Sequence, residues 1–279
     1  MKTRLLLTAC AAALLGLSAC NRDREPADPT GPNPPASPNA AVTPADGAAP
    51  LAYESKSAFA EVKLTLPPAV KAHPDLHARL YAAGVRDLRQ FVEGAQADRT
   101  EAGGDEGMPP YGKTIAFTPA AETGKLLSLQ REDADYTGGA HGNALFQGVI
   151  WDKALKRILG PADLFRPGAD LKTLDAALCA AVNAAKRARV PDAEPVALGG
   201  ATFSCPSAAE TPFVLAPGTA PGKAGGLIFL IGAYQVGPYA EGPYTVALPQ
   251  ALIRPLLAPA YADEFAGAPV KAGDGFRLS

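Results

Sequence analysis

The segment DYTGGAHGN, residues 135–143, joins two strand-like stretches of the sequence and contains three glycines. Glycine readily adopts the positive φ angles that tight turns require, so we expect a short loop here. The loop leaves Tyr136, His141 and Asn143 as its large polar side chains. Together with the strand-like residues on both sides, the segment predicts an antiparallel hairpin.

Strand and helix patterns extend outward from this loop in both directions. Alternation of apolar and polar residues, or a short apolar run, predicts strands at 59–66, 114–118, 125–130, 144–151, 227–231 and 244–248. Apolar residues recur with helical spacing over 74–92 and 171–182, which predicts two main helices. Because helices and strands are segregated along the chain, we expect an α+β fold. In it, the two helices pack on antiparallel sheets in two intimately associated subdomains.

A second loop rich in glycine and tyrosine, YQVGPYAEG at residues 234–242, lies between the last two predicted strands. It predicts a rigid turn that carries Tyr239 and Glu241. Taken alone, each of the two loops is explained by folding, since glycines permit the turns and tyrosines pack over a sheet edge. A functional role for these loops is therefore inferred only when the two are considered together.

The first 19 residues have the layout of a secretory signal. Two basic residues precede an uncharged apolar run that is too short to span a membrane, and LSAC at 17–20 resembles a lipobox. In that lipoprotein family the cysteine is acylated and the signal is cut before it, so we expect a lipid anchor on Cys20. The alternative is an ordinary signal cut after Ala19. Asn21 is not the aspartate that typically retains such proteins in the inner membrane, which favours the periplasmic side of the outer membrane.

The rest of the chain divides into a tether and a folded part. Residues 20–50 combine the modified cysteine with a Pro/Ala-rich stretch that has almost no large apolar side chain, which predicts an extended tether. We expect an N-terminal α+β subdomain at 51–134, a C-terminal subdomain at 135–257 and a tail at 258–279. No later segment has the length and apolarity of a membrane span.

Charge and cysteine content narrow the classes of function. Once the signal is removed, acidic side chains outnumber basic ones, so we expect no nucleic-acid partner. Of the four cysteines, Cys10 leaves with the signal and Cys20 carries lipid, which leaves Cys179 and Cys205 as one pair. In an oxidising compartment we expect a disulfide between them, with two buried thiols as the alternative.

Two further patterns resemble a nucleotide site and a metal site, but we expect neither site to form. GMPPYGKT at 107–114 has the spacing of a phosphate loop, but its prolines lack N–H donors and a strand-like run follows, so we expect no nucleotide. His73 and His77 could share a metal on one helix face, yet Pro74 places His73 before the helix and no third ligand is apparent. Solvated histidines at the helix end are favoured, and neither a metal nor a cofactor is expected.

The motifs together resemble a known envelope domain. YTGGAHGN at 136–143, WDK at 151–153, GPADLF at 160–165 and YQVGPYAEG at 234–242 resemble the RsiV/PdaC-type family in order and spacing. That family includes the extracytoplasmic part of an anti-sigma factor and the non-catalytic part of a peptidoglycan deacetylase. The resemblance covers roughly residues 53–257. It implies an α+β domain and, from the anti-sigma factor, lysozyme binding.

The sequence also departs from this family. It shows no cytoplasmic segment or spanning helix, and only a short tail follows residue 257, so we expect neither sigma-factor sequestration nor deacetylase activity. The stretch DKALKR after Trp151 lacks the Thr-Gly that is usual at the family's hairpin turn.

The resemblance implies an envelope-anchored, non-catalytic domain that recognises lysozyme-like proteins or peptidoglycan fragments. The expected contact residues lie in the two loops: Tyr136, His141, Asn143, Tyr239 and Glu241. Acidic residues at 132, 133 and 135 would suit a basic partner such as lysozyme. Two alternatives remain: an enzyme that acts on cell-wall glycan with His141 and a nearby carboxylate as acid and base, and a structural envelope protein.

Overall fold

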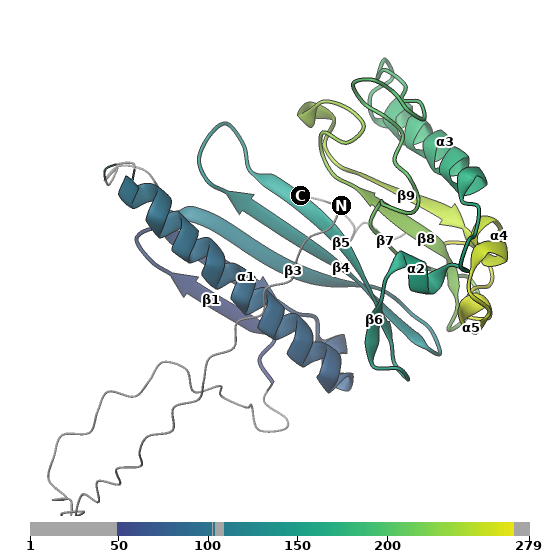
Figure 1. Cartoon of the computed structure of the whole chain (residues 1–279), viewed down its shortest axis with the longest axis horizontal. Coiled ribbons are helices and arrows are strands. Elements are labelled where there is room, and N and C mark those ends of the chain that lie inside the picture. The colour runs from purple at the N-terminus through teal and green to yellow at the C-terminus, as the bar shows by residue number, and fades with distance from the viewer. Residues whose placement is uncertain (1–48, 102, 104–108, 271–279) are drawn as a thin grey trace, which may run out of the picture. The chain divides into compact units, whose positions relative to one another are not determined.

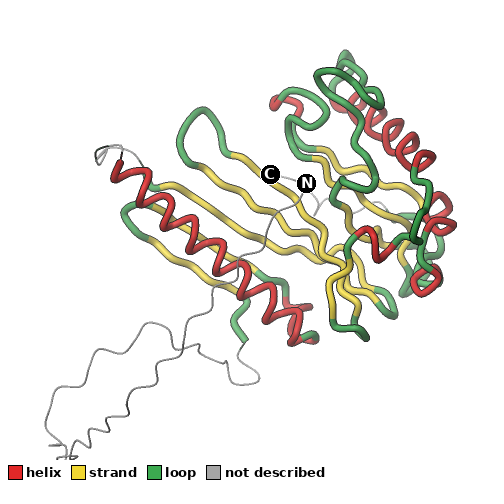
Figure 2. Tube along the Cα trace, viewed as in Figure 1, coloured by secondary structure: helices red, strands yellow, loops and turns green. Residues whose placement is uncertain are grey.

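The computed structural model describes residues 49–270 except residues 102 and 104–108 (Figures 1 and 2). The expected signal, the lipidation site at Cys20 and nearly all of the expected tether lie outside the described residues. So do the last nine residues of the expected tail and part of the segment 107–114.

The described residues form an α+β fold, as predicted, with two sheets and two long helices. The first sheet contains β1 (Ala52–Lys56), β2 (Ala60–Thr65), β3 (Tyr111–Glu122), β4 (Leu126–Tyr136), β5 (Asn143–Asp152) and β6 (Arg157–Leu159). The second contains β7 (Phe213–Pro217), β8 (Ala224–Ile231) and β9 (Tyr244–Pro249). The long helices are α1 (Pro74–Glu101) and α3 (Lys172–Arg189). The short helices are α2 (Pro161–Leu164), α4 (Gln250–Ile253) and α5 (Pro259–Ala262), and 3₁₀ turns occur at η1 (Pro68–Ala72), η2 (Tyr239–Glu241) and η3 (Arg254–Leu256).

Strand order follows the chain in both sheets, but one pair runs in parallel. The orders are β1-β2-β3-β4-β5-β6 and β7-β8-β9. Strands β2 and β3 are parallel, whereas the other neighbouring pairs are antiparallel. The 28-residue helix α1 connects β2 to β3, and a crossover of this kind returns the chain in the same direction. The expectation of antiparallel sheets therefore holds for every pair but this one.

The two sheets pack face to face, with a long helix on each outer side (Figure 1). Helix α1 covers the face of the six-stranded sheet that includes Ile115 and Leu129. Phe146 lies on the opposite face and packs against Ile228 and its neighbours on the three-stranded sheet. Helix α3 covers the outer face of that second sheet through Leu178 and adjacent apolar residues. The central strand β8 is buried at every residue, as predicted for its apolar run.

The sheets are joined where β5 meets β7. The carbonyl group of Phe213 occupies the space that a Cβ at Gly148 would need, so only glycine permits this approach. Nearby, the backbone N–H of Leu215 donates a hydrogen bond to the hydroxyl of Ser128 at 3.0 Å. Toward the start of β5 the sheets separate (Figure 1), which places the 234–242 loop and the β4–β5 loop at the open end.

The hairpin between β5 and β6 forms without the Thr-Gly pair of the family it resembles. Lys156 adopts a φ of 52°, so a lysine takes the left-handed conformation that a glycine would take more easily. The carboxylate of Asp152 accepts hydrogen bonds from the backbone N–H groups of Ala154 and Leu155 and stabilises the turn.

The structure also bears on the predicted disulfide, the predicted subdomain boundary and the predicted exposure of His77. Cys179 and Cys205 form a disulfide, as predicted. The expected subdomain boundary between residues 134 and 135 falls inside β4, because the six-stranded sheet continues to β6. The expectation of a solvated His77 is wrong, since this side chain is 6% exposed and its Nε2 lies 2.8 Å from the carbonyl oxygen of Pro50.

Candidate binding site

The loop between β4 and β5 is a tight turn built on glycines. Gly138 and Gly139 have φ angles of 95° and 92°, so the expected positive φ angles are confirmed. The hydroxyl of Tyr136 donates a hydrogen bond to the carbonyl of Gly139 at 3.1 Å, and the tyrosine remains 38% exposed. His141 and Asn143 are also exposed. The turn therefore presents the three predicted polar side chains at the surface.

The 234–242 loop contains the turn η2 and ends at Gly242, whose φ is 71°. Helix α3 holds this loop through two cations. Arg189 donates hydrogen bonds to the carbonyls of Glu241 and Pro243, both at 2.6 Å. Lys186, only 2% exposed, donates to the carbonyl of Val236. The loop is therefore fixed to the helix from both ends.

The two loops meet through their aromatic side chains. The imidazole of His141 stacks on the phenol ring of Tyr239, with centroids 3.6 Å apart and planes 12° apart. The hydroxyl of Tyr239 donates a hydrogen bond to the carbonyl of Gly142 at 2.9 Å. Tyr234 completes the group, with its hydroxyl 3.3 Å from His141 Nε2 and its ring 5.4 Å from that of Tyr239. We call His141, Tyr234 and Tyr239 the aromatic cluster.

Tyr234 is the member of this cluster that is not among the contact residues predicted from the sequence. It is 56% exposed and has a φ of 66°, a left-handed conformation that is costly for an aromatic residue. Such backbone strain tends to persist at functional sites, where the surrounding structure holds it. Its position among the glycines and tyrosines of the 234–242 loop is the signal in the sequence that could have identified it.

A groove of about 600 Å³ opens beside the aromatic cluster, where the six-stranded sheet faces the loop that joins β8 to β9 of the three-stranded sheet. Tyr136, Asn143 and Tyr239 line it, so three of the five predicted contact residues surround one space. Its floor is mainly apolar and includes Ala134, Ala144 and Phe146 of the six-stranded sheet. We call it the inter-sheet groove.

Glu241 differs from the other predicted contact residues because its carboxylate is turned inward. The side chain is 10% exposed, and its Oε2 lies 2.8 Å from Lys186 Nζ and accepts a hydrogen bond from the Tyr244 hydroxyl at 2.8 Å. Burial acts to raise the pKa of Glu241, but the hydrogen bonds from Lys186 and Tyr244 outweigh it and hold the pKa below its usual range. Burial and the same carboxylate raise the pKa of Tyr244 to about 12. Glu241 therefore positions the loop that carries Tyr239.

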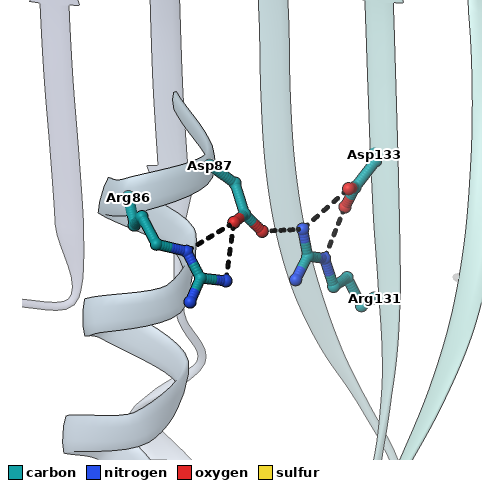
Figure 3. Close-up of polar contacts among 4 residues, drawn as sticks. All are labelled: Arg86, Asp87, Arg131 and Asp133. Carbon is teal, nitrogen blue, oxygen red and sulfur yellow. Dashed lines mark hydrogen bonds and ion pairs between the residues drawn. The ribbon is translucent and has the colours of Figure 1, made fainter. Parts of the chain in front are cut away.

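The acidic residues of β4 also have different roles. Asp133 is buried and forms a bidentate ion pair with Arg131. The guanidinium of Arg131 also donates a hydrogen bond to Asp87 of α1 (Figure 3). Burial acts to raise the pKa of Asp87, but the hydrogen bonds from Arg131 and Arg86 outweigh it and lower the pKa. This network ties α1 to the sheet, so Asp133 is not available to a partner. Glu132 lies on the opposite face and lines the inter-sheet groove.

Comparisons with known proteins identify structures with a similar fold. No protein-family model matches the chain, and no curated protein matches it. A crystal structure of a DUF3298 family member from Bacteroides fragilis NCTC 9343 matches with a TM-score of 0.52 and 18% identity, over 76% of this chain and 94% of that one. A DUF3298 family protein from Pseudomonas aeruginosa PAO1 matches with a TM-score of 0.47 and 15% identity, over 77% and 94%.

The first of these structural neighbours is a member of a domain family of unknown function, which corresponds coarsely to the RsiV/PdaC-type resemblance. At this identity, the first match establishes a shared α+β fold. The chemistry of the site must therefore be argued from this chain's own residues.

The described residues contain neither a grouped set of metal ligands nor a helix suited to a membrane span. Between residues 49 and 270, apart from the undescribed positions, no three His, Cys, Asp or Glu side chains are grouped as a metal site. None of the helices in the same part of the chain has the length and apolarity needed to cross a membrane.

Proposed function

We propose that this protein is an envelope-anchored lipoprotein whose folded domain binds lysozyme-like proteins or peptidoglycan fragments, without catalysis. The observation that carries the proposal is the stacking of His141 on Tyr239, which joins two sequence-distant loops into one exposed surface. The anchor on Cys20 and the placement at the periplasmic side of the outer membrane are parts of the same proposal.

The aromatic cluster has the physical properties of a recognition surface. Tyrosine provides a large contact area with few rotatable bonds, so little conformational entropy is lost when a partner binds. Here, hydrogen bonds to Gly139 and Gly142 already hold Tyr136 and Tyr239 in place. A partner would therefore meet a surface organised before binding, which favours affinity.

The contacts of His141 favour binding over acid–base catalysis. Its Nδ1 lies 2.9 Å from the carbonyl oxygen of Gly142, and its Nε2 lies 3.3 Å from the hydroxyl of Tyr234. In the described structure these partners are a carbonyl and a phenol, whereas the enzyme alternative calls for a carboxylate beside the imidazole. The purely structural alternative leaves the exposure of Tyr234 and its strained backbone without an explanation.

The test is a calorimetric titration of the purified protein with lysozyme and with soluble muropeptides, combined with chromatography of the muropeptides afterwards. We expect saturable binding of one of these ligands, with no new glycan product. Tyr239→Ala should weaken binding about tenfold or more, as expected for an aromatic hot spot. Leu155→Ala is the matched control, because Leu155 is 58% exposed and lies in the β5–β6 turn, outside the two loops.

Thermal unfolding of both variants separates a binding effect from a folding effect. If neither lysozyme nor the muropeptides bind, the proposal is contradicted. New glycan products that disappear with His141→Ala would replace it with the enzyme alternative.

A further inference from the structure

The inter-sheet groove has a defined inner surface. Cross-strand partners point to the same face of a sheet, so the pairing of Glu132 with Phe146 places both side chains toward the three-stranded sheet. Ala134 and Ala144 form the next pair along the same face. The groove is thus an apolar floor beside a carboxylate, and Tyr136 and Tyr239 are among its lining residues.

The carboxylate of Glu132 has no hydrogen-bond or ion-pair partner among the described residues, although it is partly buried. Glu61, the other glutamate that lines the groove, is paired with Lys56. Lys113 is the basic residue among those that line the groove, and its Nζ lies 5.6 Å from the ring of Phe91 on α1, on the other side of the sheet. Asp135 also lines the groove, but it follows Asp133 by two residues along β4 and is the cross-strand partner of Lys113, so its side chain belongs to the α1 face of the sheet. Among the described residues that line the groove, Glu132 is therefore the one uncompensated carboxylate on the inner face.

We propose that the inter-sheet groove binds an arginine or lysine side chain of a protein partner, with the cation on Glu132 and the alkyl chain on Ala134, Ala144 and Phe146. This inference rests on the proposed binding function and names the chemistry that the partner presents. Long basic side chains combine an apolar stem with a charged end, which matches this floor and this carboxylate. Burial raises the pKa of Glu132 because it disfavours the charged carboxylate. A bound cation would offset this penalty.

The test uses two peptides that differ in charge: acetyl-Leu-Arg-Leu-amide and the same peptide with citrulline in place of arginine. Citrulline has nearly the same shape as arginine but is neutral. We expect the arginine peptide to bind about tenfold more tightly, and we expect Glu132→Gln to abolish this preference. Glu93→Gln is the matched control, because it removes the same charge from an exposed position on α1. Amide chemical shifts of the full protein report the affinity, the site and the integrity of the fold.

The inference is overturned if both peptides bind equally, if neither binds at millimolar concentration, or if Glu132→Gln retains the preference for arginine. A parallel titration with lysozyme separates this inference from the proposed function. If Tyr239→Ala weakens lysozyme binding and Glu132→Gln does not, the groove inference fails and the binding function stands. If the arginine preference depends on Glu132 but lysozyme and muropeptides do not bind, the groove inference stands and the proposed identity of the ligand fails.

Discussion

The imidazole of His141 lies parallel to the ring of Tyr239, with centroids 3.6 Å apart, and the Tyr239 hydroxyl donates to the carbonyl of Gly142 next to His141. This contact couples the β4–β5 loop to the 234–242 loop. Tyr239→Phe keeps the stacking and removes one hydrogen bond, so we expect a loss of about 1 kcal/mol in the free energy of unfolding. A double-mutant cycle with His141→Ala and Tyr239→Ala in urea should give a coupling of about 1 kcal/mol. A coupling of zero would contradict a stabilising stack.

The ion pair between Lys186 and Glu241 should stabilise the folded state in a pH-dependent way. Glu241→Gln leaves the cation of Lys186 buried without its carboxylate, so we expect a loss of about 2 kcal/mol at neutral pH. The pKa of Glu241 is lowered below its usual value of 4.5, because hydrogen bonds from Lys186 and Tyr244 outweigh burial. A carboxyl with a lowered folded-state pKa contributes stability above the unfolded-state pKa and loses it as the pH falls through the folded-state value.

We therefore expect the difference in unfolding free energy between wild type and Glu241→Gln to be constant near pH 7 and to shrink below about pH 4.5. Urea denaturation at several pH values measures this difference. A difference that grows on acidification would contradict the assigned sign.

The disulfide between Cys179 and Cys205 anchors α3, the helix that holds the 234–242 loop. It closes a loop with a sequence separation of 26 residues. In the loop-entropy model, the double variant Cys179→Ser/Cys205→Ser should lose roughly 3 to 4 kcal/mol of stability. Thermal denaturation of the oxidised wild type, the reduced wild type and the double variant measures the effect. An unchanged melting temperature in all three would show that the disulfide contributes little.

Gly148 should be the glycine whose replacement separates the two sheets. A Cβ at this position would overlap the carbonyl of Phe213, so Gly148→Ala should cost about 3 kcal/mol or more. Gly94→Ala is the control, because nothing lies within 4 Å of its Cβ position in α1 and alanine favours helix. That control should gain about 0.5–1 kcal/mol. Equal stability of the two variants would contradict the close approach of β5 and β7.

Lipidation at Cys20 gives the proposed anchor a direct test. Cys20→Ala removes the acylated thiol, and we expect the protein to move from the membrane fraction to the soluble periplasmic fraction. Mass spectrometry of the wild-type N-terminal peptide should reveal the acyl chains. An unmodified Cys20 in the mature protein would instead support an ordinary cleaved signal.

The sequence predicted the elements better than their assembly. The strand and helix patterns located β2, α1, β5, α3, β8 and β9, because alternation and helical spacing reflect which face of each element is buried. They did not reveal the parallel pairing of β2 with β3, since direction depends on the connecting helix.

The site shows the same division between local pattern and tertiary contact. Leu178, Val182 and Lys186 have the spacing of one buried helix face, so the pattern contained the signal that Lys186 is buried. The partner of Lys186 on a distant loop could not be read from that pattern. For the same reason, Glu241 was selected as a contact residue although its carboxylate is turned inward.

The most direct test of the central claim is an amide correlation spectrum of the isotope-labelled protein, recorded without ligand, with lysozyme and with soluble muropeptides. If the two loops form one recognition surface, resonances of residues 136–143 and of residues 234–242 should shift together and with the same midpoint. Shifts confined to one loop, shifts confined to the α1 side of the molecule, or a spectrum that neither ligand changes would contradict it.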